Sequence, residues 1–209
     1  AGHGCAAFEG KLYAVGGIGA AAVGGALVWR PTDKGAPHSA YFADFNRMLK
    51  REGPGKPVML IDKARLDHNI DLIAGSVGEN KTYRVVVKSL PSIELVSYIM
   101  ARANTRSLML FHQPFINLVA SRIADADVLI GKPMPVQAAR TFYRKLDAAG
   151  DFNPERQLQW LIDSPDRLLQ YQALARELKV KMRVNFELDV GLHRGGFEST
   201  QHFRDSLEV

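Results

Sequence analysis

Lys88 is the residue of this chain whose type and position best suit covalent chemistry. It follows a run of β-favouring residues, 83–87, which predicts a strand. Active sites of α/β folds are built at the carboxyl ends of parallel strands, so an amine at that place faces the mouth of the fold. A lysine there can form a Schiff base with a carbonyl group. A lone lysine at a strand end is more often a solvated residue, so the catalytic interpretation needs a second signal.

That second signal lies far downstream, between Glu187 and Phe197, where acids, a histidine, an arginine and glycines follow another apolar strand. Glycine lets the backbone turn sharply and lets a bulky ligand approach it closely. Glu187 and Asp189 are two residues apart, so both carboxylates point to the same face of a strand, which is the interior in a barrel. His193 suits a base or a residue that orients one. A capping role for His193 and a structural ion pair between Arg194 and a carboxylate are the simpler interpretations.

Arg84 lies in the same predicted strand as Lys88 and is a second cation that could act on its amine. A lysine must lose its proton before it reacts. A desolvated pocket beside another cation lowers the lysine pKa enough to allow this. Arg84 and Arg194 are the arginines expected to supply that field.

Strand-like runs alternate with helical stretches from residue 57 onward. Asp62 is expected to cap the first helix, and Ser164-Pro165-Asp166 is a strong start signal for a later one. Strands that alternate with helices of this size predict right-handed βαβ units and a parallel sheet. The predicted strands are 58–61, 83–87, 107–111, 127–130, 158–162 and 182–188.

The number of predicted strands bears on the architecture. A closed (β/α)8 barrel of the TIM type typically has about 250 residues. About six βα units in 209 residues therefore indicate an α/β chain that holds only part of such a barrel. An open, doubly wound sheet of six strands is the alternative that the length permits. No glycine-rich loop follows the first predicted strand, which makes a dinucleotide-binding sheet the weaker prediction.

Residues 1–36 are predicted to be a leader and linker, residues 37–56 a lead-in, and residues 57–209 the partial barrel domain. Residues 12–29 carry no charged side chain, are rich in glycine and alanine, and follow Lys11. This length borders on a membrane span, and the basic flank also suits a signal peptide or an uncleaved anchor. Export or anchoring at a membrane is therefore expected. A cytoplasmic location and a Gly/Ala-rich helix buried in the domain are the alternatives.

Composition excludes several kinds of function. The net charge of +5 comes from basic residues scattered along predicted amphipathic helices rather than gathered with aromatics, so nucleic-acid binding is not expected. Cys5 is the only cysteine, which excludes an intrachain disulfide and a cysteine-based zinc site. With 46% hydrophobic residues, the chain can bury a sizeable core.

Together the two segments resemble the fold type III pyridoxal-phosphate enzymes with an alanine-racemase-like barrel, most closely the D-threonine aldolase and D-serine dehydratase branch. The resemblance covers roughly residues 57–205. Lys88 matches the lysine that carries pyridoxal phosphate as an internal aldimine. Arg194 falls where alanine racemases place an arginine near the substrate side of the cofactor. Glu187 stands where those racemases carry a modified lysine, which favours the aldolase branch.

The resemblance implies a pyridoxal-phosphate-dependent lyase that acts on a D-3-hydroxy amino acid as its small-molecule substrate and that works as a homodimer. An amino-acid racemase and a non-catalytic carrier of pyridoxal phosphate are the alternatives. In this branch a carboxyl-terminal β domain holds a divalent metal, and this sequence offers no ligand for that metal or for the cofactor phosphate. The residues implied in catalysis are Lys88, His193 and Arg194, and those implied in cofactor binding are Lys88, Arg84, Asp189 and Arg194.

Overall fold

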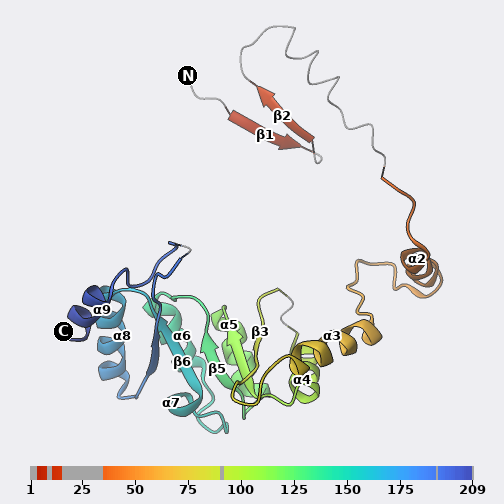
Figure 1. Ribbon diagram of the computed structural model, residues 1–209. Coiled ribbons are helices and arrows are strands. Elements are labelled where there is room, and N and C mark those ends of the chain that lie inside the picture. Colours follow the sequence, from red (N-terminus) through yellow and green to blue (C-terminus); the bar gives the residue numbers. More distant parts are fainter. Residues whose placement is uncertain (1–3, 9–10, 16–34, 90–91, 192, 209) are drawn as a thin grey trace. The chain divides into compact units, whose positions relative to one another are not determined.

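The computed structural model describes residues 4–8, 11–15, 35–89, 92–191 and 193–208 (Figure 1). The chain divides into two compact units, Ala1–Met59 and Leu60–Val209. The first unit contains an antiparallel hairpin of strands β1 (Gly4–Phe8) and β2 (Lys11–Val15), and helix α2 (Ala40–Glu52).

The predicted leader segment, residues 12–29, begins within strand β2, and its residues 16–29 lie outside the described part of the chain. Where the chain is described, it has no helix that is both long and apolar enough to cross a membrane. Anchoring and export therefore stay predictions.

The second unit is built on a parallel sheet whose strands follow one another in chain order. Each observed strand lies within a predicted one, which confirms those five predictions. The strands are β3 (Arg84–Val86), β4 (Ser107–Leu110), β5 (Asp127–Ile130), β6 (Leu158–Ile162) and β7 (Arg183–Phe186). The helices are α3 (Lys63–Gly75), α4 (Ile93–Arg102), α5 (Gln113–Arg122), α6 (Val136–Lys145), α7 (Pro154–Gln157), α8 (Pro165–Leu178) and α9 (Thr200–Leu207).

The strand order decides between the two architectures. Right-handed crossovers between strands that are neighbours in both sequence and space place successive helices on the same face of the sheet. Contacts of α5 with α6 and of α6 with α8 agree with a single helical layer. A doubly wound sheet needs a reversal of strand order and helices on both faces. The described sheet has no reversal, so it is an arc of a (β/α) barrel, as expected.

The prediction of a strand at residues 58–61 is wrong for the described structure. This segment pairs with no described strand, and its four apolar side chains are between 43% and 68% exposed. An apolar run becomes a strand only when a neighbouring strand supplies hydrogen-bond partners, and β propensity depends strongly on that context. The described sheet therefore has five strands rather than six.

Both predicted helix starts are confirmed by their caps. The Asp62 carboxylate accepts a hydrogen bond from the backbone N–H of Arg65 at 3.1 Å, at the start of α3. The Ser164 hydroxyl accepts one from the N–H of Arg167 at 3.3 Å, and Pro165 opens α8. These bonds satisfy donors that the first turn of a helix leaves free.

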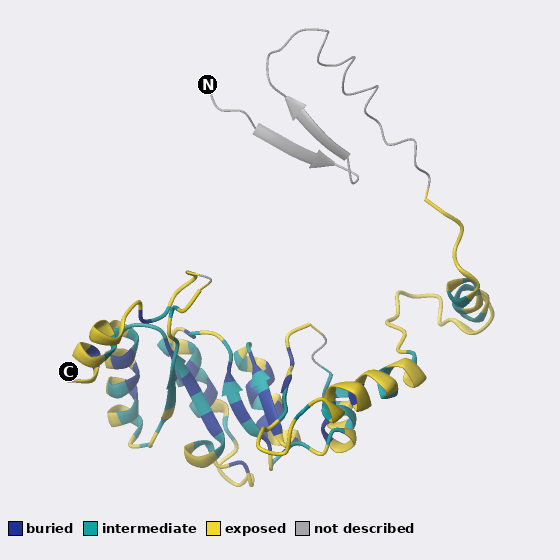
Figure 2. Cartoon of the chain, in the orientation of Figure 1, coloured by how far each residue is buried: buried dark blue, intermediate teal, exposed yellow. Residues whose placement is uncertain are grey.

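The core lies between the sheet and its helices, where Figure 2 shows the buried residues in dark blue along the strands. Alternate strand residues point into it, Leu108, Leu110 and Trp160 among them. The Trp160 ring lies 5.7 Å from that of Phe142 and 5.6 Å from that of Tyr171, between ring centroids. The Tyr171 hydroxyl donates to the carbonyl of Met134 at 3.2 Å, and burial raises the pKa of Tyr171. The opposite face of the strands is the interior side of the barrel arc, and it carries both polar residues, such as Arg84 and Asp127, and apolar ones, such as Val86 and Met109.

Candidate active site at the carboxyl ends of the strands

The carboxyl ends of the parallel strands share one edge of the sheet, and the predicted site residues follow two of those ends. Lys88 comes after β3, and Glu187 comes directly after β7. Two residues without a functional signal in the sequence follow the strands between them, Phe111 after β4 and Gly131 after β5. This edge is where active sites of (β/α) barrels form.

Lys88 points to the interior side of the arc. Val85 and Val87 are buried in the core, and the N–H of Val87 still donates to the carbonyl of Met109 at 2.9 Å. The chain is thus paired with β4 through residue 87. Lys88 lies at the bend that follows and is exposed, which agrees with a side chain that alternates with the buried Val87 and faces away from the helices. Its Nζ lies 5.6 Å from the centroid of the Phe111 ring. Lys88 makes no ion pair with any residue that the structure describes.

Phe111 holds this position because residue 131 has no side chain. A Cβ atom placed on Gly131 would lie 2.5 Å from the Cε1 and Cζ atoms of Phe111 and 2.7 Å from Cγ of Met109. Gly131 therefore lets the aromatic ring lie across the end of β5, beside Lys88. The sequence offers no local signal for this contact, since it depends on neighbouring strands.

Replacing Gly131 with alanine should destabilise the protein by about 1–3 kcal/mol and displace the Phe111 ring, because the added methyl group overlaps packed atoms. Urea unfolding of the variant and of the unchanged chain measures the difference. Gly78→Ala is the control, since a Cβ there meets no atom within 4 Å. Equal stability of the two variants would contradict the close packing at Gly131.

The segment from Glu187 to Phe197 is a loop whose two ends are held together. The N–H of Asp189 donates to the carbonyl of Phe197 at 3.0 Å, and the N–H of Phe197 donates to that of Glu187 at 2.8 Å. Gly196 has φ +106°, and a Cβ there would lie 2.6 Å from the Glu187 carbonyl oxygen. Phe197 is buried against Phe186, with ring centroids 5.7 Å apart. The loop is therefore fixed to the core at its base.

Inside this loop, Asp189 binds His193 and not Arg194. One carboxylate oxygen accepts the backbone N–H of His193 at 3.0 Å, and the other lies 3.1 Å from its Nδ1 atom. The side chain of Asp189 is 13% exposed and that of His193 is 80% exposed. Arg194 is exposed and forms no ion pair with the described residues, so the structural pair with a carboxylate is not found.

The structure does not support the predicted role of Arg84 beside Lys88. Arg84 begins β3, four residues before Lys88, which is about 13 Å along an extended chain. Its guanidinium group donates to the carbonyls of Leu108 and Asp127, each at 2.9 Å, and forms an ion pair with the Asp127 carboxylate. Arg84 is therefore a cross-link between strands at their amino ends.

This cross-link belongs to a polar network that crosses the interior side of the sheet. The second Asp127 carboxylate oxygen accepts from Gln159 at 3.0 Å, and Gln159 in turn accepts from Asn185 at 2.9 Å. The Ser107 hydroxyl also donates to Asp127, at 3.3 Å. The network thus connects β3, β4, β5, β6 and β7. Its members lie far apart along the chain, so no local sequence pattern indicates this network.

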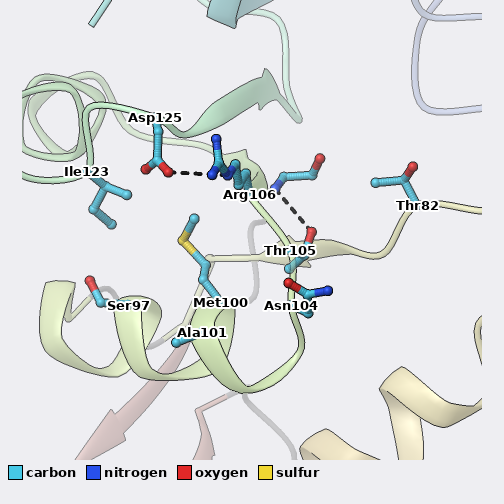
Figure 3. Close-up of a pocket in the computed structure, with 10 residues that line it drawn as sticks. Thr82, Ser97, Met100, Ala101, Asn104, Thr105, Arg106, Ile123 and Asp125 are labelled. Carbon is cyan, nitrogen blue, oxygen red and sulfur yellow. Dashed lines mark hydrogen bonds and ion pairs between the residues drawn. The ribbon is translucent and has the colours of Figure 1, made fainter. Parts of the chain in front are cut away.

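A cavity of about 580 Å³ lies at the other end of the strands (Figure 3). It is lined by Thr82, Ser107 and Asp125, which precede or begin β3, β4 and β5. Arg106 forms an ion pair with Asp125 at 3.3 Å on its wall. Since Lys88 lies at the opposite edge, this cavity is not part of the candidate site.

The structure thus places Lys88 and the Asp189–His193 pair on one edge, but on the two outer strands of the arc. Strands β3 and β7 are separated by three others, about 19 Å at ordinary strand spacing. No described contact joins Lys88 to His193 or Arg194. Among the described residues, no cluster of three or more His, Cys, Asp or Glu side chains could hold a metal ion.

The comparison with curated proteins found no match. The family model described as "Alanine racemase, N-terminal domain" matches residues 61–208. The match includes Lys88, all five strands of the parallel sheet and the loop that holds Asp189 and His193. Because it covers more than half of the sequence, the chain belongs to the alanine racemase N-terminal domain family.

Proposed function

We propose that this chain is the cofactor-bearing part of a pyridoxal-phosphate-dependent lyase that acts on a D-3-hydroxy amino acid. The observation that carries the proposal is the position of Lys88. Its amine follows a barrel strand at the carboxyl edge and points to the interior side of the arc, without an ion pair among the described residues. Membership of a family whose fold typically binds pyridoxal phosphate supports the same cofactor.

The residues at this edge fit that cofactor. A primary amine free of a carboxylate partner can bind it covalently, and the Phe111 ring offers an apolar surface beside the amine. When bound, pyridoxal phosphate withdraws electrons from the amino-acid Cα and so eases cleavage of its bonds. The protein must then orient the breaking bond and supply a path for the proton.

The loop after β7 supplies groups for those tasks. His193 can accept or return a proton, since imidazole is a base near neutral pH. Arg194 can bind the substrate carboxylate with a planar, charged fork. In a closed barrel of eight strands, a strand and the fourth strand after it lie across the axis from each other. Closure would therefore turn the interior sides of β3 and β7 toward one another, with Lys88 and His193 on opposite walls.

The identity of the acid at residue 187 favours the lyase over a racemase. By resemblance, alanine racemases carry a modified lysine at this place, and Glu187 cannot take that role. Glu187 donates its backbone N–H to the carbonyl of Ile162 at 2.9 Å, so its place after β7 is fixed.

Product analysis tests the proposal. The full-length protein, loaded with pyridoxal phosphate, is incubated with D-threonine, D-serine and alanine in turn. Cleavage of D-threonine to glycine and an aldehyde, or of D-serine to pyruvate and ammonia, supports the lyase. Inversion of alanine without these products supports the racemase instead. Cofactor absorbance without turnover of any of the three identifies a carrier.

Removing the charge of Arg194 should lower turnover on the order of 10²-fold, because a charge-assisted bond to the substrate is lost. Stability should change by no more than about 0.5 kcal/mol, since Arg194 has no ion pair among the described residues. Steady-state kinetics and urea unfolding of Arg194→Gln measure the two effects. Arg204→Gln, at an exposed arginine of α9, is the control. Equal losses of turnover and stability would indicate a structural role.

We also propose that residues 1–36 direct the protein to a membrane or through it. The uncharged stretch 12–29 and its basic flank support this assignment. Deletion of residues 1–36 should leave the barrel unit folded, because its sheet begins only at Arg84. It should also move the protein from the membrane or exported fraction to the cytosol. An aggregating truncated chain, together with a freely cytosolic intact chain, would show that the segment belongs to the core.

A further inference from the structure

We propose that Asp189 is a positioning residue, which fixes the imidazole of His193 in the tautomer with hydrogen on Nδ1 and leaves Nε2 as a proton acceptor. The use of Nε2 in catalysis rests on the proposed function. The tautomer is a property of the chain alone, so it can be measured without cofactor or substrate.

The carboxylate of Asp189 binds His193 through both of its oxygens. Its two oxygens receive separate donors from one residue, the His193 backbone N–H at 3.0 Å and the His193 Nδ1 at 3.1 Å. An ionised carboxylate only accepts hydrogen bonds, so the ring nitrogen that faces it carries the hydrogen. In neutral imidazole the other nitrogen is then an acceptor. Asp189 is itself shielded from water, with 13% of its side chain exposed, so solvent competes little for this contact.

The backbone of His193 holds the ring in a fixed place. His193 has φ +48°, a left-handed conformation that few residues other than glycine adopt. The bond from its own N–H to Asp189 compensates for that conformation, and the base of the loop is closed by the pairing of Asp189 with Phe197. The loop therefore presents the ring in a defined orientation.

The second ring nitrogen of His193, Nε2, points away from Asp189. Nδ1 and Nε2 lie on opposite sides of an imidazole ring, so a ring bound through Nδ1 directs Nε2 away from Asp189. His193 is largely exposed, and no described residue bonds to its Nε2. The acceptor nitrogen is thus available at the carboxyl edge of the sheet, where a substrate would bind. A carboxylate that orients a histidine in this way is a recurring device of acid–base catalysis.

Nitrogen-15 NMR of the full chain, labelled at histidine, tests the tautomer through two-bond correlations between ring carbon-bound hydrogens and ring nitrogens. The spectra are recorded at a pH where imidazole is neutral. His193→Asn identifies the signal. His193 should favour hydrogen on Nδ1 on the order of tenfold, the effect of a charge-assisted hydrogen bond. In Asp189→Ala this preference should disappear, and hydrogen on Nε2 should predominate, as it does in free histidine.

His202 is the matched control, because its ring contacts Phe197 at 5.4 Å between centroids and none of the described carboxylates. Its tautomer should stay unchanged in Asp189→Ala, which also shows that the loop base is intact. If Asp189→Ala unfolds the loop, Asp189→Asn takes its place in the experiment. The asparagine keeps an acceptor oxygen, so this variant should keep part of the preference for hydrogen on Nδ1. Hydrogen on Nε2 of His193 in the unchanged chain, or an unaltered tautomer in both variants, would overturn the proposal.

Kinetics of the loaded full-length enzyme then separate the two proposals. Asp189→Asn should lower kcat by at least about tenfold with little change in KM, since Asp189 acts through His193 and not on the substrate. An Nδ1–H tautomer in a protein that cleaves no amino acid would confirm the role of Asp189 and contradict the lyase. Turnover with a kcat unaffected by Asp189→Asn would overturn the catalytic part of this inference and leave the lyase intact.

Discussion

Replacing Lys88 with alanine should abolish the absorbance of bound pyridoxal phosphate in the full-length protein. The amine is the only group proposed to hold the cofactor covalently, and neither a methyl side chain nor arginine can replace it. Lys88→Arg keeps the positive charge beside the Phe111 ring, so it should keep the fold and still lose the absorbance. Turnover should fall to background in both variants, because the electron-withdrawing group is no longer attached.

Borohydride reduction locates the attachment site directly. Reduction of the unchanged protein should fix the cofactor to Lys88, which peptide mass spectrometry can identify. Lys132 is the matched control, because it is also exposed at the carboxyl edge of the sheet, just after β5. Lys132→Ala should keep the absorbance. A reduced adduct on Lys132 or on any other lysine would contradict the assignment of Lys88.

Replacing Asp127 with alanine should destabilise the barrel unit by about 2–3 kcal/mol. The change leaves the Arg84 guanidinium without its carboxylate and removes an acceptor from both Ser107 and Gln159. Loss of a partner from a buried ion pair costs about 3–5 kcal/mol, and partial exposure of these side chains, 24% for Arg84 and 34% for Asp127, reduces that cost. Urea unfolding measures the change.

Asp125→Ala is the control for this experiment. Asp125 lies two residues earlier and pairs with Arg106, but these side chains are 58% and 74% exposed, so its loss should cost no more than about 1 kcal/mol. A double-mutant cycle of Arg84→Ala and Asp127→Ala isolates the pairwise interaction. If Asp127→Ala costs no more than Asp125→Ala, the polar network does not hold the strands together.

The sequence by itself determined the five paired strands, the caps of α3 and α8, and the family. These features depend on local patterns. Apolar side chains alternate or cluster within residues 127–130 and 158–162. Such a pattern predicts a strand in any fold that buries one face of it. Ser164 meets its N–H partner only three residues away, so the cap needs no distant contact. Lys88 could be placed at a strand end for the same reason.

Only the tertiary structure decided which groups act together. Residues 58–61 have the composition of a strand, but no described strand pairs with them. Arg84 is bound by Asp127, far along the chain, and so lies away from the amine that it was expected to influence. Asp189 binds His193 inside a loop whose base is closed by the pairing of Asp189 with Phe197, a contact that the close approach of Gly196 to Glu187 permits. Such pairings depend on where strands and loops lie in space, which residue type and spacing alone do not specify.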